Sequence, residues 1–88
     1  MTQVNATTGE PYTNGNQMTL QLCKEQRGYD ANEWLTFVQA TNKNRKVKKG
    51  EHGVKLVRVV TYYDEQKKEQ KGIKTFVVFN VEQTEAIA

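Results

Sequence analysis

The chain has 88 residues, of which 36% are hydrophobic and 26% charged, and its formal net charge is +3. A chain this short forms one domain with a modest core, which leaves little room for a deep catalytic cleft. Its one cysteine excludes an intrachain disulfide, and apolar runs fall short of the ~18 residues that a membrane-spanning helix needs. Since the N-terminus also lacks the apolar segment of a signal peptide, we expect a cytoplasmic protein.

The N-terminal third of the chain predicts a tail followed by a helix. Residues 1–8 are polar and aperiodic, so we expect a flexible N-terminal tail, with residues 9–88 forming a single domain. Asn16 is a suitable N-cap for a helix over Gln17–Arg27, where apolar residues recur at helical spacing. Gly28 follows at the position where a left-handed residue commonly ends a helix.

A second, shorter helix is predicted after an irregular or extended segment over Tyr29–Leu35. Thr36 and Gln39 have the spacing of a capping box, in which a hydroxyl and an amide three residues later satisfy each other's backbone groups. This predicts a helix from Phe37 to about Lys43. Asn44 tolerates the left-handed conformation that would end it.

The C-terminal half predicts a long hairpin. Val54–Tyr63 is dominated by β-branched and aromatic residues, and Ile73–Val81 has the same character. Between them Asp64–Gly72 is a charged loop, and Glu82–Ala88 is expected to be a short tail. The predicted fold is therefore α+β, with one or two helices packed on a small antiparallel sheet of three to four strands that includes the long C-terminal hairpin.

The residues that carry most enzyme chemistry are scarce. Cys23 lies on the apolar face of the first predicted helix, so we interpret it as a core thiol rather than a nucleophile. His52 lies in a basic, glycine-flanked turn, where a surface or phosphate-facing role is favoured over a general base. One cysteine and one histidine do not make a recognisable zinc site, and neither a P-loop nor a nucleophile elbow occurs. We therefore expect no catalytic residue, no metal and no cofactor, and hence no enzyme activity.

Positive charge is concentrated in one segment. Residues 42–58 hold seven basic residues and one acid, a net +6, so the remaining six basic and nine acidic residues carry −3. A local excess of this kind is typical of a surface that contacts phosphates, although a lysine-rich turn is often only a solvated face. The seven basic residues are Lys43, Arg45, Lys46, Lys48, Lys49, Lys55 and Arg58.

Aromatic residues accompany this charge. Binding of a single strand needs cations along the backbone and exposed rings on which unpaired bases stack. Of the eight aromatic residues, we expect Phe37, Phe76 and Phe79 to be mostly in the core and Tyr12 to be free to stack, while Trp34 suits either environment. In the strand Val54–Tyr63 each face carries basic and tyrosine residues, so alternation alone does not identify the buried face.

Several short motifs occur in a characteristic order along nearly the whole chain, from about Asn5 to Ile87. They are Thr8-Gly9-Glu10-Pro11-Tyr12 with Asn16, Gly28-Tyr29, Trp34-Leu35-Thr36-Phe37 with Gln39-Ala40, Val47-Lys48-Lys49-Gly50-Glu51-His52-Gly53, and Val78-Phe79-Asn80-Val81-Glu82-Gln83-Thr84. On these motifs the chain resembles the N-terminal domain of ArdC-type antirestriction proteins, a single-stranded-DNA-binding domain of plasmids, phages and other mobile elements.

Two features depart from this family's pattern. The family's glycine stands two residues before the asparagine, whereas here Gly15 immediately precedes Asn16, and Asn42-Lys43-Asn44 replaces a glycine-rich end of the second helix. Both replacements tolerate a left-handed backbone, so the fold is expected to survive. Family members continue into a metalloprotease-like domain with a zinc-binding helix, and we expect that domain's activity to be absent from this chain.

The resemblance implies which residues lie near the nucleic acid. It places Tyr12, Asn16, Trp34, Thr36 and the turn Lys48-Lys49-Gly50 there, and the basic residues named above together with His52 complete the predicted site. Asn80 and Gln83 are expected to be structural, satisfying backbone groups where a strand ends.

The sequence therefore predicts a module that binds single-stranded DNA without strong sequence preference. We expect it to assist a polymerase, primase or helicase of the same mobile element, without a membrane or a small-molecule substrate as partner. Two alternatives stay open: an adaptor or antirestriction factor that acts through a protein partner, and an RNA-binding module. A DNA mimic is disfavoured because such a protein would be acidic.

Overall fold

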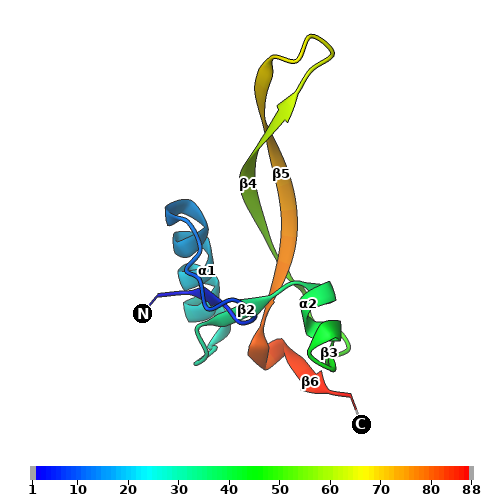
Figure 1. The fold of residues 1–88 in the computed structure, drawn as a ribbon. Helices are drawn as coiled ribbons and strands as arrows, with labels where there is room; N and C mark the ends of the chain where they lie inside the picture. Colours follow the sequence, from blue (N-terminus) through cyan, green and yellow to red (C-terminus); the bar gives the residue numbers. More distant parts are fainter. Residues whose placement is uncertain (1, 88) are drawn as a thin grey trace.

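The protein consists of a small body and a long projecting arm (Figure 1). A computed structural model describes residues 2–87, and its longest dimension is 49 Å against 28 and 24 Å for the other two. The predicted α+β class is confirmed. In chain order the elements are β1 (Val4–Asn5), α1 (Asn14–Arg27), β2 (Glu33–Leu35), α2 (Phe37–Asn42), β3 (Arg45–Val47), β4 (Val54–Tyr63), β5 (Glu69–Asn80), the 3-10 helix η1 (Val81–Gln83) and β6 (Thr84–Ala86).

The strands form a four-stranded sheet and a two-stranded one. The larger sheet has the order β1-β2-β5-β4 and is antiparallel except for the parallel pair of β1 and β2. The smaller sheet pairs β3 with β6 at the end of the body away from the arm (Figure 1). Glu82–Ala88 was expected to be a tail, but η1 and β6 occupy most of it, because β6 finds its hydrogen-bonding partner in β3, far away in the sequence.

The N-terminal residues also belong to the body, so the predicted flexible tail over residues 1–8 is wrong for its central part. Val4 and Asn5 pair with β2, and Gln3 is fully buried. The Gln3 backbone amide donates to Gln17 Oε1 at 2.8 Å, and its side-chain oxygen accepts from Trp34 Nε1 at 2.7 Å. This anchoring depends on polar contacts, which hydrophobic periodicity does not reveal.

The helix α1 begins earlier than predicted and has a different cap. It starts at Asn14, and Thr13 is its N-cap in an extended conformation without a side-chain capping bond. Asn16, the predicted N-cap, lies inside the first turn. The predicted end is confirmed, since Gly28 is left-handed with φ 75° and its amide donates to the Lys24 carbonyl at 2.9 Å.

The second helix follows the prediction closely. Thr36 and Gln39 form the capping box, and the helix ends at Asn42, one residue before the predicted limit. Asn44 then adopts the left-handed conformation with φ 59°. The side chain of Phe37 is 62% exposed, so its predicted place in the core is wrong. A residue at the first position of a helix this short lies at the rim of the body.

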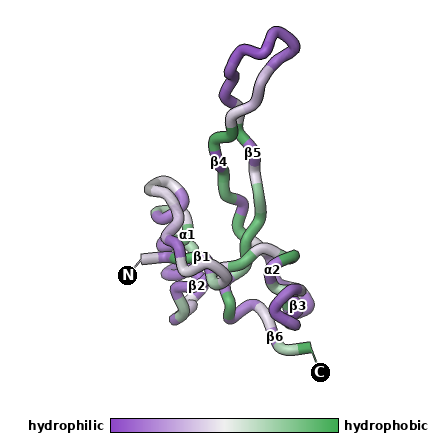
Figure 2. Tube along the Cα trace, viewed as in Figure 1, coloured by the Kyte–Doolittle hydropathy of each residue, from purple (hydrophilic) through white to green (hydrophobic). Residues whose placement is uncertain are grey.

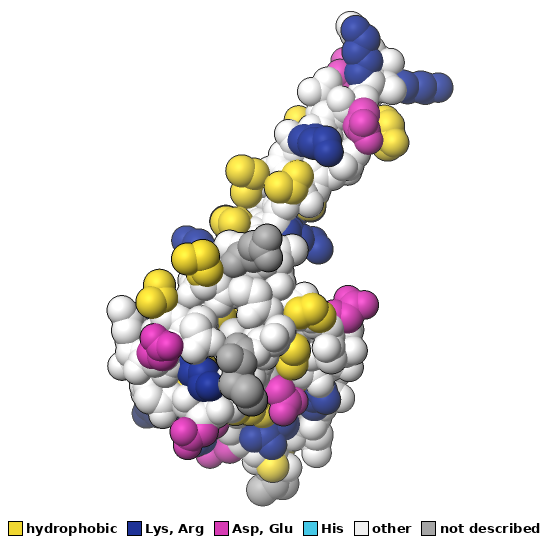
Figure 3. Space-filling model, turned by 90° about the vertical axis from the view of Figure 1, so that its left-hand side faces the viewer, with side chains coloured by type: hydrophobic (Ala, Val, Ile, Leu, Met, Phe, Trp, Pro, Cys, Tyr) yellow, Lys and Arg dark blue, Asp and Glu magenta, His cyan; other side chains and the backbone are white. Residues whose placement is uncertain are grey.

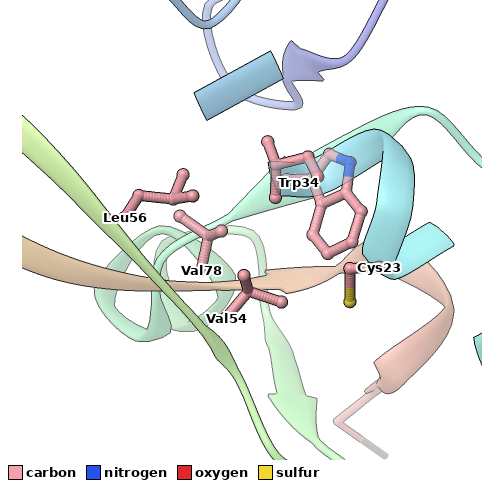
Figure 4. Close-up of a cluster of buried hydrophobic side chains, with 6 residues drawn as sticks. Cys23, Trp34, Val54, Leu56 and Val78 are labelled. Carbon is pink, nitrogen blue, oxygen red and sulfur yellow. The ribbon is translucent and has the colours of Figure 1, made fainter. Parts of the chain in front are cut away.

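The core lies where α1 packs against the base of the arm. Its buried residues are Leu20, Cys23, Trp34, Val54, Leu56 and Val78, and Figure 4 labels all of them except Leu20. Tyr12, Tyr29 and Phe76 pack against this cluster. The prediction that Cys23 is a core thiol is confirmed. Burial raises the pKa of this thiol, and the charge of Arg27 opposes that rise. Burial of Val54 and Leu56 also settles which face of β4 points inward.

The arm is the hairpin of β4 and β5. The two strands pair over ten residues, from Val54 opposite Val78 to Tyr63 opposite Glu69. The strand β5 begins at Glu69 rather than at the predicted Ile73, because Asp64 closes a much shorter turn by accepting from the amides of Gln66 and Lys68, each at 2.9 Å. The shaft is mostly hydrophobic and the tip hydrophilic (Figure 2).

Candidate nucleic-acid interface

The arm has two faces of different character. The inner face carries Val54, Leu56, Arg58, Val60 and Tyr62 of β4 with Gln70, Gly72, Lys74, Phe76 and Val78 of β5. The outer face carries Lys55, Val57, Val59, Thr61 and Tyr63 with Glu69, Lys71, Ile73, Thr75 and Val77. The base of the inner face is buried under the body, whereas all ten outer residues are exposed.

A groove separates the arm from the segment that leads into α1. Its volume is about 820 Å³, and its lining includes residues from both faces of the arm, so it wraps around the edge of β4. The described lining contains no acidic side chain. It consists of Pro11, Tyr12, Thr13, Gly15, Asn16, Thr19, Val57, Arg58, Val59, Ile73 and Phe76. Three residues of the predicted site, Tyr12, Asn16 and Arg58, therefore meet at one place.

Asn16 fastens the arm to α1. Its Nδ2 donates to the Val57 carbonyl at 2.8 Å, and its Oδ1 accepts from the Val57 amide at 3.4 Å. The side-chain amide thus pairs with β4 as a neighbouring strand would, at the edge where the sheet ends. Only 6% of Asn16 is exposed, so this residue shapes the groove and offers little of its own surface to a ligand.

Tyr12 forms one wall of the groove and is half-buried. Its ring packs against the core, and its hydroxyl donates to the Trp34 carbonyl at 3.5 Å and accepts from Asn5 Nδ2 at 3.3 Å. Burial raises the pKa of this phenol above its ordinary value, with an opposing contribution from the bond to Asn5. Tyr12 is therefore neutral at physiological pH, and the exposed part of its ring is available for stacking.

Two residues of the predicted site lie elsewhere. Trp34 is fully buried, with its ring edge-to-face against Tyr29 at a centroid distance of 6.0 Å. Because its ring is enclosed in the core, Trp34 offers no exposed surface on which a base could stack. Thr36 is half-buried, and its hydroxyl accepts from the Gln39 amide at 3.2 Å as part of the capping box. Neither residue lines the groove.

The predicted basic segment is divided between the arm and the body. Lys55 and Arg58 are on the arm, whereas five basic residues lie in or beside β3 on the body: Lys43, Arg45, Lys46, Lys48 and Lys49. Several groups in this body cluster already have partners. Arg45 donates to the hydroxyl and the carbonyl of Thr84 at 2.8 and 2.9 Å, and Lys46 lies 3.7 Å from Glu85. Lys48 and Lys49 are exposed in the turn.

His52 is also placed on the body. It is exposed, and its backbone carbonyl accepts from Arg27 at 2.7 Å and from Gln83 Nε2 at 2.8 Å. The predicted structural role of Asn80 and Gln83 is confirmed, since Gln83 Oε1 accepts from the Asn80 amide at 2.8 Å and both residues are buried. The turn that contains His52 is therefore fixed by backbone contacts.

The sequence analysis missed two cations of the arm. Lys74 lies opposite Arg58 on the inner face, and Lys71 lies opposite Thr61 on the outer face. Together with Lys55 and Arg58 they give the shaft, over residues 54–62 and 70–80, four cations and no acid. Hydrophobic and basic side chains both lie along the arm in the view of Figure 3. Only the register of the hairpin brings the four cations together.

Comparison with known proteins identifies the family. The family model described as the N-terminal domain of the anti-restriction factor ArdC matches residues 1–86. The chain belongs to the ArdC N-terminal domain family. No curated protein matches the chain.

Two solved structures of ArdC from plasmid R388 have the same fold. The metal-free structure is 29% identical, with a TM-score of 0.87, and the match covers 100% of this chain and 34% of ArdC. The Mn(II)-bound structure is 30% identical, with a TM-score of 0.84, and the match covers 99% and 35%. The chain thus spans about a third of the length of ArdC.

Within residues 2–87 no three side chains of His, Cys, Asp or Glu are grouped so that they could hold a metal ion. None of the helices described for the chain combines the length and apolar character needed to cross a bilayer.

Proposed function

We propose that this domain binds single-stranded DNA, largely without sequence preference, in the groove between the arm and the segment Pro11–Asn16. The observation that carries the proposal is the composition of the groove. It joins two aromatic residues, Tyr12 and Phe76, with the basic residue Arg58, and its described lining contains no acid. Stacking of a base on an aromatic ring contributes roughly 1–3 kcal/mol, and each phosphate contact adds affinity through counterion release.

The apolar part of the groove favours a single strand over a duplex. The bases of a duplex stack on one another, so its accessible surface is mainly phosphate and groove edges. Unpaired bases can instead lie on Tyr12, Phe76 and the neighbouring valines. Positive potential extends beyond the groove along the path proposed for the DNA. Lys74 supplies it opposite Arg58, and Lys55 and Lys71 supply it on the outer face.

In this proposal the domain has no catalytic step of its own. It acts as an accessory that holds a template or displaced strand beside a polymerase, primase or helicase of the same mobile element. A role in antirestriction is the second candidate, and membership of the ArdC N-terminal family favours it. Co-purification of a replication enzyme would support the first role, and protection of DNA from a restriction enzyme would support the second.

The test is fluorescence anisotropy of a labelled 20-mer, as single strand and as duplex, over a range of salt concentrations. Two variants remove the same charge from different places: Arg58→Ala/Lys74→Ala on the arm and Lys48→Ala/Lys49→Ala on the body. We expect the arm variant to weaken single-strand binding about tenfold or more. It should also lower the salt slope by about 1.4, since each contact contributes roughly 0.7 on a single strand.

The body variant, Lys48→Ala/Lys49→Ala, is the control and should change the affinity for the single strand by less than about threefold. A larger loss in the body variant than in the arm variant would move the site to the β3 turn. No binding of the single strand at low salt would refute the proposal and direct attention to protein partners.

A further inference from the structure

The outer face of the arm carries an apolar stripe on a ribbon of only two strands. Val57, Val59 and Ile73 are 52%, 68% and 73% exposed, and Tyr63 and Val77 continue the stripe toward the tip and the body. A two-stranded hairpin alone is marginally stable in water, and contiguous apolar surface on a soluble protein usually marks a contact. The body stabilises the lower part of the arm, where β5 pairs with β2 through Phe79 and Asn80 and where Asn16 bonds the backbone of Val57.

We propose that the outer faces of two copies of this chain pack against each other, with the two arms antiparallel. The two-fold axis passes between the copies at the pair Val59–Ile73, the middle of the five residue pairs of the outer face. Each of these two residues then lies near its counterpart in the second copy. Such an interface is isologous, as in most homodimers.

The charges of the outer face favour this orientation. Lys55 is at the body end of the stripe, and Tyr63 lies opposite Glu69 at its tip end. In the antiparallel arrangement Lys55 of each copy lies over Tyr63 and beside Glu69 of the other, which allows a cation–π contact and an ion pair. A parallel arrangement would instead place Lys55 over Val77 and diagonally beside Lys55 of the other copy, and Glu69 diagonally beside Glu69, and these like charges destabilise the pairing.

The remaining outer residues are compatible with the antiparallel arrangement. The pair Thr61–Lys71 of one copy faces the pair Val57–Thr75 of the other. The aliphatic stem of Lys71 can cover Val57 while its ammonium group stays in water. The apolar surface of both copies is thereby covered without burial of an unpaired charge.

The size of the face predicts a weak dimer. Each copy contributes ten outer residues. A stable interface commonly uses about 20–30 residues and buries ~800 Å² on each partner. We therefore expect a concentration-dependent dimer in the micromolar to millimolar range rather than an obligate one.

The outer face overlaps the groove. Val57, Val59 and Ile73 belong to both surfaces. A strand bound in the groove and a second copy on the outer face should therefore compete, so that an oligonucleotide shifts the protein toward the monomer. This competition rests on the proposed function, whereas the self-association does not.

Sedimentation of the chain over a concentration series, without nucleic acid, tests the proposal. We expect reversible dimerisation that Val59→Asp weakens at least tenfold. Val38→Asp is the matched control, because Val38 is 65% exposed on α2 and is not one of the ten residues of the outer face. Ile73→Asp serves as a second variant if Val59→Asp fails to fold.

Cysteine cross-linking tests the register. Val59→Cys lies near the axis and should form a disulfide-linked dimer on mild oxidation, whereas Thr61→Cys should not link to itself. Native Cys23 is buried and serves in both variants as the same background. A chain that stays monomeric at millimolar concentration would overturn the proposal. So would a dimer that Val38→Asp disrupts and Val59→Asp does not, or one that forms only on added oligonucleotide.

Discussion

The body and the arm use polar and apolar residues in opposite ways. In the body, Gln3, Asn80 and Gln83 are at most 1% exposed, and hydrogen bonds satisfy them. On the arm, Val59 and Ile73 are more than two-thirds exposed. Buried hydrogen-bonded amides specify one arrangement of the body, since each would be costly to leave unpaired. On the arm the apolar side chains are exposed to solvent, where a ligand or a second copy of the chain can contact them.

The largest effect on the free energy of unfolding is expected from a substitution in the core of the body. Trp34→Ala removes the largest buried side chain and should lower the free energy of unfolding by about 3–5 kcal/mol. In a domain this small that leaves little stability, so the variant should be largely unfolded in urea titrations followed by circular dichroism. Trp34→Phe keeps a ring but removes the donor to Gln3, and a smaller loss of about 1–3 kcal/mol is expected. Equal stability of Trp34→Ala and wild type would contradict this account of the core.

An intermediate effect on stability is expected from removing the hydrogen bonds that join the body to the arm. Asn16→Ala removes both bonds to Val57, at a cost of about 1–3 kcal/mol for the amide and carbonyl left unpaired. Hydrogen exchange should accelerate in β4 around Val57 and little around Trp34. Thr19→Ala is the control, because Thr19 also lines the groove but bonds within its own helix, to the Gly15 carbonyl. Uniform acceleration through the body would mean that Asn16 supports the whole fold rather than the arm.

The smallest effect on stability is expected on the arm itself. Arg58 lies directly opposite Lys74, so Arg58→Glu replaces a repulsive pair with an attractive one. This should protect the arm's amides by about 0.2–1 kcal/mol, and the gain should fade at high salt. Under the proposed function the same change weakens binding of a single strand. A variant with a more stable arm and a lower affinity for the single strand would show that the arm's cations favour binding and destabilise the hairpin. Loss of both would indicate that Arg58 supports the arm through another contact.

The local signals in the sequence were sufficient for much of the fold. The capping box of Thr36, the left-handed Gly28 and Asn44, and the limits of β4 depend on residues within a few positions of one another. The short strands β1, β3 and β6 were not predicted. Each has two or three residues and exists only because a distant segment pairs with it.

The candidate site was less predictable than the fold. The charge count groups Arg58 with the lysines around β3, although folding places Arg58 on the arm and those lysines on the body. Lys74 was missed because the loop was extended to Gly72, and a loop four residues too long shifts every cross-strand partner in the hairpin. The indole of Trp34 is compatible with the core and with an exposed stacking surface. Its place in the core depends on the buried side-chain amide of Gln3, whose oxygen accepts from the indole Nε1.

The open arm has a consequence for how this protein's stability is measured. Heat-capacity change and denaturant sensitivity scale with the surface that unfolding exposes, and most buried surface lies in the body. Opening of the distal arm is therefore a separate, low-energy event that precedes the main cooperative transition. A calorimetric melting temperature would measure unfolding of the body and would not detect opening of the arm, on which the proposed binding depends. Variants of the arm therefore need to be compared by site-resolved hydrogen exchange, because two proteins with the same Tm can differ in whether their arm is formed.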